Sequence, residues 1–444
     1  MVNSPEQLPP GVQRPLPGER GQRLVEALAL AECPALTQRR ARRSELSGAL
    51  HDPIVWTRAQ GVNVWDADGN RYVDLSAGFG AATLGHGHPE VVQAVQAQAA
   101  TLLHALGDLH PSDIKIELLT RLSALAPFPK ARVMLGLSGS DAVTAALKSA
   151  LLFTRKPGVL AFEGGYHGLE HGPLAACGYS AKMRAPFAPQ LNPHVVFAPY
   201  PGAAVACEDA LLAVERTWGT REDVGAVLIE PLLGRGGVVV PPPGFLAALR
   251  GLCERRGALL IADEVLTGLG RTGAMLACVQ QGAQPHLVCL GKALGGGLPI
   301  SACIGDSHVM AAWGDPDGEA LHTGTFFGNP LACAAALAAL RVLQRDGLAA
   351  RAERVGEALI AALRERLGAR VQAVRGAGLL IGIELASPGR ALALGRALLE
   401  RGYITVPAAP DARVVSLTPP LVIEDAVIAG FVTALDQALA EVGG

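Results

Sequence analysis

Between residues 130 and 305 the chain alternates short apolar runs with longer amphipathic segments, and this pattern limits the fold more than any other feature. Runs rich in Val, Leu, Ile and Ala occur at 132–138, 158–164, 194–200, 226–232, 258–265 and 286–291. Such continuous apolar runs are typical of strands that are buried on both faces of a parallel sheet. Helical spacing of apolar residues at 138–156 and 242–257 places helices between them. The sequence therefore predicts an α/β fold with a mostly parallel sheet covered by helices.

The chain before residue 76 differs from this pattern in its composition and in the spacing of its apolar residues. We expect residues 1–50 to form an N-terminal extension, with a proline-rich start, a short amphipathic helix at 21–32 and an arginine cluster at 38–45 that acts as a solvated arm. Two β-rich runs joined by Asp-Ala-Asp-Gly-Asn predict a hairpin at 62–75. We assign residues 51–75 to a segment that packs with a small C-terminal domain.

The chain changes again after Asn329-Pro330. Residues 76–330 are expected to form the large domain, and residues 331–444 a smaller α+β domain. In this last part an alanine-rich helix is expected to run without interruption to about residue 368. Strands are expected at 378–385, 404–407 and 413–423, before a final helix.

Composition excludes several classes of protein. The net charge is −2, acidic and basic residues are interspersed, and only 4% of residues are aromatic, so nucleic-acid binding is not expected. The longest apolar run, Leu331 to Leu340, is too short to cross a membrane. The polar N-terminus has no apolar core typical of a signal peptide, and the eight cysteines are scattered without metal-like spacing. A cytoplasmic protein without a metal site is therefore expected.

One lysine stands out among the six in the chain. Lys292 directly follows the apolar strand at 286–291 and precedes a run of glycines, whereas the other lysines lie in polar, loop-like or charged helical contexts. Burial disfavours the ammonium form and makes lysine a usable amine nucleophile. Lys292 is therefore the first candidate for catalysis.

An acid and an anion site complete this candidate set. Asp263 ends the apolar strand 258–265, where an ionised carboxylate must be paired; it would bind a metal, act as a base or hold a cationic ring nitrogen. Ser138-Gly139-Ser140-Asp141 joins a strand to a helix, and free N–H groups at a helix N-terminus bind anions. A lysine, an acid and a phosphate cradle together suggest pyridoxal phosphate.

Two segments resemble nucleotide-binding motifs but lack a residue that each motif requires. Gly268–Gly273 matches GxGxxG, but no acidic residue follows before Gly305, as a dinucleotide site would require. Gly291-Lys292 lacks the first glycine of a P-loop, since that position is His286. Neither motif supports nucleotide binding.

The ordered motifs resemble the class III aminotransferases, a fold type I group of pyridoxal-phosphate enzymes that includes the ornithine and 4-aminobutyrate aminotransferases. The resemblance covers about residue 55 to the C-terminus. It is carried by YVDLSAGFG…GHGHP, SGSDAVTAALK, FEGGYHG, IEPLLGRGGVVVPPPGFL, LLIADEVLTGLGRTG, GKALGGGLP and HTGTFFGNPLA. It implies a homodimer with a large domain and a smaller one.

The resemblance also implies roles for individual residues. Lys292 would hold the cofactor as a Schiff base and move the proton, and Asp263 would keep its ring nitrogen protonated. Tyr166 would stack on the ring. Further cofactor-site residues implied in this way are Ser138, Gly139, Ser140, His167, Glu230 and Val265, with Thr325 reaching the phosphate of the neighbouring subunit. His86 and His88 are expected to be structural turn residues.

The sequence departs from the family pattern at three positions. Leu266 stands where relatives often have a glutamine that donates to the cofactor. Arg235 replaces a common acid. Ser416 stands where many members have an arginine that binds the substrate carboxylate, and Arg413, three residues earlier, would point to the opposite strand face.

The leading hypothesis is an aminotransferase that moves nitrogen from an ω-amine or amino acid to a keto acid by a ping-pong Schiff-base mechanism. A racemase, epimerase or aminomutase on the same scaffold is the alternative. A third reading is a binding or assembly protein that kept only the fold.

Overall fold

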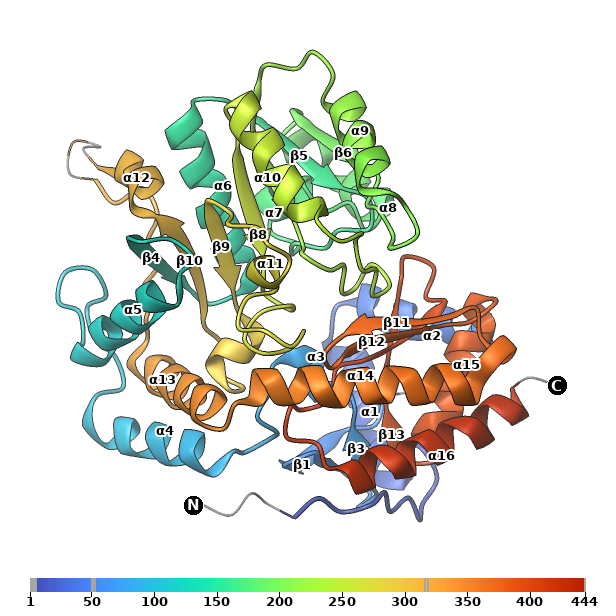
Figure 1. Cartoon of the computed structure of the whole chain (residues 1–444). Helices are drawn as coiled ribbons and strands as arrows, with labels where there is room; N and C mark the ends of the chain where they lie inside the picture. Colours follow the sequence, from blue (N-terminus) through green and yellow to red (C-terminus); the bar gives the residue numbers. More distant parts are fainter. Residues whose placement is uncertain (1–5, 49–52, 315–316, 318, 443–444) are drawn as a thin grey trace.

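The computed structural model describes residues 6–48, 53–314, 317 and 319–442. One large sheet occupies the upper half of the view in Figure 1, and two smaller sheets lie below it at the right. Among the described residues, no helix is both long and apolar enough to span a bilayer. The arrangement therefore has a large α/β part and a smaller α+β part; the residue boundaries given above for domains stay a prediction.

The large sheet has seven strands in the order β4-β10-β9-β8-β7-β5-β6. Their bounds are β4 (Ala131–Gly136), β5 (Gly158–Phe162), β6 (Val195–Ala198), β7 (Val224–Ile229), β8 (Leu259–Asp263), β9 (Leu287–Leu290) and β10 (Ser301–Asp306). Neighbours from β9 to β6 pair in parallel, whereas β10 runs antiparallel to both β9 and β4. The predicted mostly parallel sheet is confirmed, and β10 is the strand that the sequence pattern did not single out.

Both faces of this sheet are buried, which explains the continuous apolar runs. In β8, Leu260 and Ala262 face the core that contains α13, while Leu259 and Ile261 face the core that contains α6. The helices around the sheet are α4 (Pro89–Thr101), α5 (Asp113–Leu125), α6 (Gly139–Thr154), α7 (His171–Ala175), α8 (Ala181–Arg184), η1 (Ala185–Gln190), α9 (Cys207–Trp218), α10 (Phe245–Arg256), α11 (Ala277–Gln280), η2 (Lys292–Gly295), α12 (Ser307–Met310) and η3 (Ala311–Trp313).

The smaller sheets join distant parts of the chain. One has the order β11-β12-β15-β14, with β11 (Ala373–Ala377), β12 (Leu380–Glu384), β14 (Val406–Ala408) and β15 (Val414–Leu417). The other pairs β1 (Trp56–Gln60), β2 (Asn63–Asp66) and β3 (Arg71–Asp74) with β13 (Tyr403–Ile404). Because β3 pairs with β13, the predicted hairpin at 62–75 lies beside C-terminal residues. The remaining short and C-terminal helices are α3 (Ala77–Gly80), η4 (Gly368–Arg370), α15 (Pro388–Glu400) and α16 (Asp425–Glu441).

The expectation of one uninterrupted helix from 330 to 368 is wrong. The structure has two helices, α13 (Pro330–Arg345) and α14 (Leu348–Leu367). Gly347 between them has φ +59° and ψ 35°, a left-handed conformation that glycine adopts readily and that ends a helix. Helical periodicity on both sides had hidden this break.

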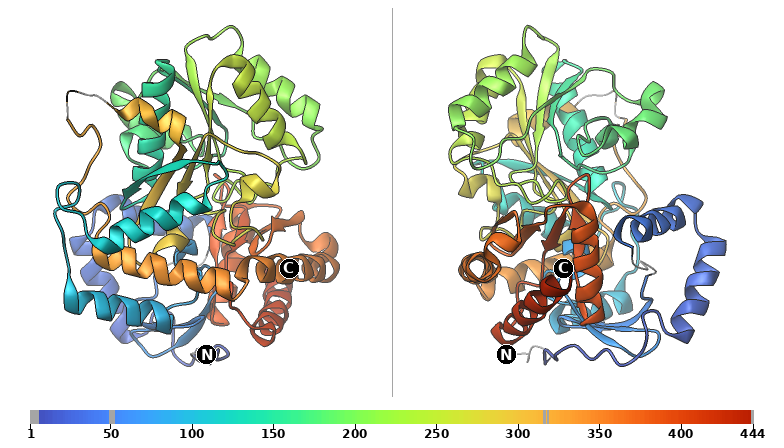
Figure 2. Two further views of the ribbon diagram at one scale, coloured as in Figure 1. Left: turned by 60° about the vertical axis from the view of Figure 1, so that its left-hand side comes forward. Right: turned by 90° about the vertical axis from the view of Figure 1, so that its right-hand side faces the viewer.

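The arginine cluster is solvated in part, since α2 has no buried residue, but it is not a detached arm. It belongs to helix α2 (Pro34–Ser47), which follows α1 (Glu19–Ala31) and contacts α15. In the right-hand view of Figure 2 these two dark-blue helices lie beside the α15 side of the molecule. The extension is thus ordered helix that brings arginines to the body of the protein.

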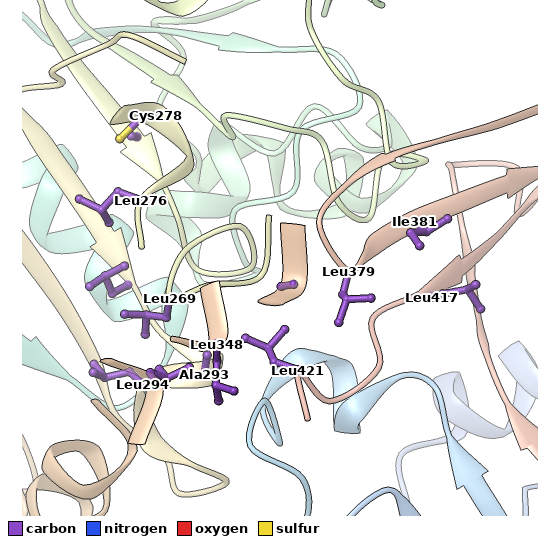
Figure 3. Close-up of a cluster of buried hydrophobic side chains, with 14 of the residues drawn as sticks. Leu269, Leu276, Cys278, Ala293, Leu294, Leu348, Leu379, Ile381, Leu417 and Leu421 are labelled. Carbon is purple, nitrogen blue, oxygen red and sulfur yellow. The ribbon is translucent and has the colours of Figure 1, made fainter. Parts of the chain in front are cut away.

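A buried apolar cluster connects the two parts of the molecule. Figure 3 shows Ala293 and Leu294, which directly follow Lys292, beside Leu348 at the start of α14. Leu379 and Leu421, from the C-terminal part, lie in the same cluster. The segment that carries Lys292 is therefore fixed between the large sheet and the C-terminal elements.

Candidate active site

Three titratable side chains meet at the carboxyl ends of adjacent strands. Glu230 follows β7, Asp263 is the last residue of β8, and Lys292 lies two residues beyond β9. Because these strands are parallel neighbours, their carboxyl ends share one edge of the sheet, where ligands of such sheets bind. The sequence had placed Lys292 and Asp263 at strand ends, and the structure brings both together with Glu230.

Asp263 is held in a buried hydrogen-bond network. Its Oδ2 lies 2.7 Å from Nδ1 of His167, and its Oδ1 accepts a 3.1 Å hydrogen bond from the N–H of Val265. Asp263 is 4% exposed and His167 3% exposed. Among the described residues, Nε2 of His167 is a buried polar atom without a partner. A cationic ring group beside Asp263 would supply the charge that this buried carboxylate requires.

Lys292 has the electrostatic environment of a nucleophile. Burial lowers the pKa of its ammonium group, the carboxylates of Asp263 and Glu230 oppose this shift, and the positive charge of Arg235 adds to it. A lower pKa means that more of the amine is neutral near neutral pH, and only the neutral amine attacks a carbonyl. The backbone of Lys292 has φ +37°, an uncommon conformation at a functional position.

The N-terminus of α6 forms the predicted anion site. The N–H groups of Gly139 and Ser140 lie in its first turn, where the helix itself offers no acceptor. The Ser138 hydroxyl is used differently, since its Oγ accepts the N–H of Asp141 at 3.1 Å and donates to Oε1 of Glu170 at 3.1 Å. The hydroxyl of Ser138 therefore caps the helix, whereas the N–H groups of Gly139 and Ser140 have no acceptor within the helix.

Close packing restricts this anion site. A Cβ atom on Gly139 would lie 2.9 Å from Cγ1 of Val265, and one on Gly168 would overlap Oγ of Ser140. Gly168 also has φ +112°, which favours glycine. The site thus has a lysine, a buried acid and a tight cradle at a helix N-terminus, and these residues fit pyridoxal phosphate.

Replacing Gly139 with alanine is expected to weaken cofactor binding, because the new methyl group displaces the first turn of α6 from Val265. Overpacking of this kind costs about 1–3 kcal/mol, or roughly five- to hundred-fold in affinity. Titration of the cofactor-free enzyme with pyridoxal phosphate measures it. The double variant Gly139→Ala, Val265→Ala removes the clash and is expected to recover most of the affinity; equal affinity of Gly139→Ala and wild type would contradict the packing argument.

Glu230 positions the loop that carries Tyr166. Its Oε1 accepts the N–H of Tyr166 at 2.9 Å, and its Oε2 accepts the N–H of Gly234 at 3.0 Å. Burial raises the pKa of this carboxyl group, while both N–H groups favour its ionised form. Glu230 therefore ties Tyr166 and the segment around Gly234 to the end of β7.

Tyr166, Tyr179 and Arg235 form a compact group beside this loop. The guanidinium carbon of Arg235 lies 4.2 Å from the ring centroid of Tyr166 and 4.8 Å from that of Tyr179. The two rings are 5.9 Å apart in an edge-to-face arrangement. Arg235 was noted in the sequence only as a departure, and nothing in the sequence marked Tyr179, because its place beside Arg235 depends on the tertiary fold.

The other two departures have clear surroundings. Leu266 packs with Leu232 and Val238 in a small apolar cluster, so it fills space. Ser416 is a buried residue of β15, and Arg413 pairs with Asp411 and lies 4.0 Å from Glu384. Arg413 is therefore engaged away from the lysine.

Two predicted features lie outside the group around Lys292. Thr325 is exposed on the segment between η3 and α13. His86 pairs through Nε2 with Oδ2 of Asp74 at 2.9 Å, and His88 is the N-cap residue of α4. Within one chain, Thr325 is thus not brought to the lysine; His86 forms an isolated β-bridge with Gly61, and His88 caps α4, so both are structural residues.

The family described as class-III aminotransferase matches residues 47–439. The chain belongs to this family. Acetylornithine aminotransferase of Mycobacterium bovis is 42% identical over 87% of this chain and 92% of that protein. A 2-aminoadipate transaminase of Pseudomonas putida is 37% identical over 88% and 97%.

The comparison of structures agrees with this family. The PLP-bound form of an amine transaminase from an uncultivated Pseudomonas species superposes with a TM-score of 0.82, at 28% identity, over 88% of this chain and 95% of that one. The class III aminotransferase described here is thus a pyridoxal-phosphate enzyme with the predicted fold. The leading hypothesis of an aminotransferase is confirmed, and the reading as a non-catalytic binding protein is wrong.

Proposed function

We propose that this aminotransferase takes nitrogen from an ω-amine or amino acid at Lys292 and passes it to a keto acid at the same site. The observation that supports this most is the meeting of Lys292, Asp263 and the N-terminus of α6 at one sheet edge. When bound, pyridoxal phosphate supplies a ring that accepts the electron pair released from the substrate carbon.

Each residue has a defined role in this proposal. Lys292, with its lowered pKa, attacks a carbonyl carbon as a neutral amine. Its Nζ then accepts and returns the proton of the substrate carbon. Asp263, fixed by His167 and Val265, holds a proton on the ring nitrogen. Gly139 and Ser140 bind the phosphate, Val265 packs against this cradle, Glu230 orients Tyr166, and Tyr166 covers the ring.

The test is a dependence on acceptor. With an amine donor alone, an aminotransferase converts one equivalent per site and stops, because the nitrogen stays on the cofactor; adding a keto acid restores turnover. Mass spectrometry of donor and product measures both stages. Continuous isomerisation or racemisation of the donor without a keto acid would overturn the proposal in favour of the isomerase.

We further propose a homodimer in which Thr325 reaches the phosphate bound by the neighbouring subunit. Exposed apolar side chains support a partner surface: Phe79 is 71%, Leu106 60%, Leu109 76% and Phe326 55% exposed. Monomeric proteins rarely expose clusters of such side chains. Thr325 lies in the same segment as Phe326, and its hydroxyl is a suitable phosphate donor.

Subunit mixing tests this arrangement. Thr325→Ala is expected to weaken cofactor binding about ten- to hundred-fold, as loss of one hydrogen bond to a charged group does. Mixed dimers of Thr325→Ala with Lys292→Ala subunits contain one site with both groups if Thr325 acts across the interface. The cofactor affinity of that complete site should then exceed the affinity of the Thr325→Ala homodimer; no gain in affinity in refolded, mixed dimers would place Thr325 elsewhere.

Action in the cytoplasm is part of the proposal. All eight cysteines are free thiols, and six of them are buried. A reducing compartment keeps thiols in this state.

A further inference from the structure

Arg235 has a side chain whose surroundings suggest a ligand. Its guanidinium lies over the rings of Tyr166 and Tyr179, and among the described residues it forms no ion pair with a carboxylate. A hydrogen bond with the Tyr166 hydroxyl occupies part of the guanidinium edge, and a guanidinium has five N–H donors in all. These donors match the two oxygens of a carboxylate.

The position of Arg235 is fixed by the surrounding backbone. Its carbonyl oxygen accepts the N–H of Ala409 at 2.9 Å, and the carbonyl oxygen of Ala409 accepts the hydroxyl of Tyr179 at 2.8 Å. Glu230 holds Tyr166 and Gly234, on either side of the arginine. The guanidinium is therefore held in place before a ligand arrives, which lowers the entropic cost of binding.

The nearby arginines are already occupied. Arg375 pairs with Glu384 and donates to the carbonyl oxygens of Gly237 and Val238. Arg413 pairs with Asp411. Of these three arginines, Arg235 alone is available to bind a substrate anion. Its segment packs against the sheet that contains Ser416: a Cβ on Gly382 would lie 2.8 Å from Val238, and Gly382 pairs with Ser416.

A cavity lies beside the segment that contacts Lys292. A Cβ on Gly80 would lie 3.6 Å from Cδ of Lys292, and Phe79, the residue before Gly80, lines a cavity of about 340 Å³. The same cavity is lined by Arg40 and Arg43 of α2, and none of its described lining residues is acidic. Helix α2 thus adds positive charge to a cavity that reaches Phe79, the chain neighbour of Gly80.

Arg43 is the available cation of this cavity. Arg40 pairs with Glu32, whereas no described carboxylate pairs with Arg43. Burial lowers the pKa of Arg43, the charges of Arg39 and Arg235 lower it further, and Tyr179, whose ring lies against the Arg235 guanidinium, opposes the shift. An anion between them would offset this repulsion.

We propose that Arg235 binds the carboxylate of the amino acid or keto acid substrate that lies remote from the reacting carbon, and that Arg43 of α2 attracts the same carboxylate from the cavity. The inference rests on the proposed function and defines its substrate class: compounds that carry a carboxylate besides the group that reacts at Lys292. Many family members bind the substrate carboxylate with an arginine where this chain has Ser416. In this proposal Arg235, on another segment, takes over that function.

Binding of an inert dicarboxylate tests the proposal without turnover. Glutarate has two carboxylates and neither amine nor carbonyl, and glutaramide is its uncharged counterpart. Calorimetric titration of the holoenzyme should show glutarate binding well above that of glutaramide. Arg235→Gln is expected to weaken glutarate binding about ten- to hundred-fold, because charge-assisted hydrogen bonds are lost.

Arg413→Gln is the matched control, since Arg413 is a neighbouring arginine paired with Asp411, and it should bind glutarate like wild type. Arg43→Gln should weaken binding about two- to fivefold, with a loss that shrinks at high salt. Unchanged affinity in Arg235→Gln, or no preference of wild type for glutarate, would overturn the inference. The acceptor-dependence assay would still stand in that case, so the two failures are distinguishable.

Discussion

Replacing Lys292 with alanine is expected to abolish covalent retention of the cofactor and to lower turnover by at least roughly 10²–10⁴-fold. Lys292 is the only lysine that follows a strand of the large sheet at the edge shared with Asp263 and Glu230, among the residues that the structure describes. Loss of the proton transfer at Nζ alone accounts for that range. Mass spectrometry after borohydride reduction measures covalent attachment, and a coupled assay measures turnover.

Lys156→Ala is the control for this variant. Lys156 donates from Nζ to the carbonyl oxygen of Arg256, in an exposed hydrogen bond beside the amino ends of β5 and β8, opposite the edge that carries the site. Its loss should leave both readouts unchanged within about twofold, because an exposed hydrogen bond is a small contribution. Covalent cofactor and normal turnover in Lys292→Ala would move the reaction to another amine.

The residues that the sequence identified share one physical origin. Lys292 and Asp263 follow apolar runs, and the carboxyl ends of parallel strands meet at one edge, so strand prediction alone brought them together. Gly139 and Ser140 were found in the same way, from the rule that a strand-to-helix junction leaves free N–H groups. Local pattern was sufficient here because each signal lies within a single element and its end.

Contacts between distant segments were not predictable in this way. The pair formed by Arg235 and Tyr179 depends on how residues 179, 235 and 409 meet in space, and the sequence carries no spacing that announces it. Helix α2 was missed for the same reason. Its arginines alone indicate a solvated arm, and only the tertiary structure shows the contact between α2 and α15. The break at Gly347 was hidden by helical periodicity on both sides.

Most of these missed features concern the substrate side of the site. The cofactor side is built on strand ends and a helix N-terminus, which local sequence specifies. In the substrate site that we propose, the residues lie on loops and on helix α2, as is common where one scaffold serves many substrates. Chemistry was therefore easier to infer than specificity, and Arg235 shows the difference, because its residue type was visible in the sequence while its neighbours were not.

Asp263→Asn is expected to lower turnover by about ten- to thousand-fold. Asparagine has nearly the same shape and can still accept the N–H of Val265, but it lacks the charge. An opposite charge at short range raises the pKa of a cationic nitrogen by about 1–3 units. Removing it lowers the pKa of the ring nitrogen by that amount, so less of the nitrogen is protonated at neutral pH. Nitrogen-15 chemical shifts of labelled cofactor against pH measure this directly.

Glu264→Gln separates this electrostatic role from burial. Glu264 is adjacent and 1% exposed, and its carboxyl accepts the Thr267 hydroxyl at 2.6 Å and the N–H of Cys278 at 2.7 Å. Burial raises the pKa of Glu264 and the hydrogen bonds from Thr267 and Cys278 oppose this shift, so the carboxyl is engaged by groups other than Lys292. Turnover of folded Glu264→Gln should stay within about threefold of wild type, because Glu264 contacts no reacting group. An equal loss in both variants, or an unshifted nitrogen resonance in Asp263→Asn, would show that Asp263 acts through packing and His167 and not through its charge.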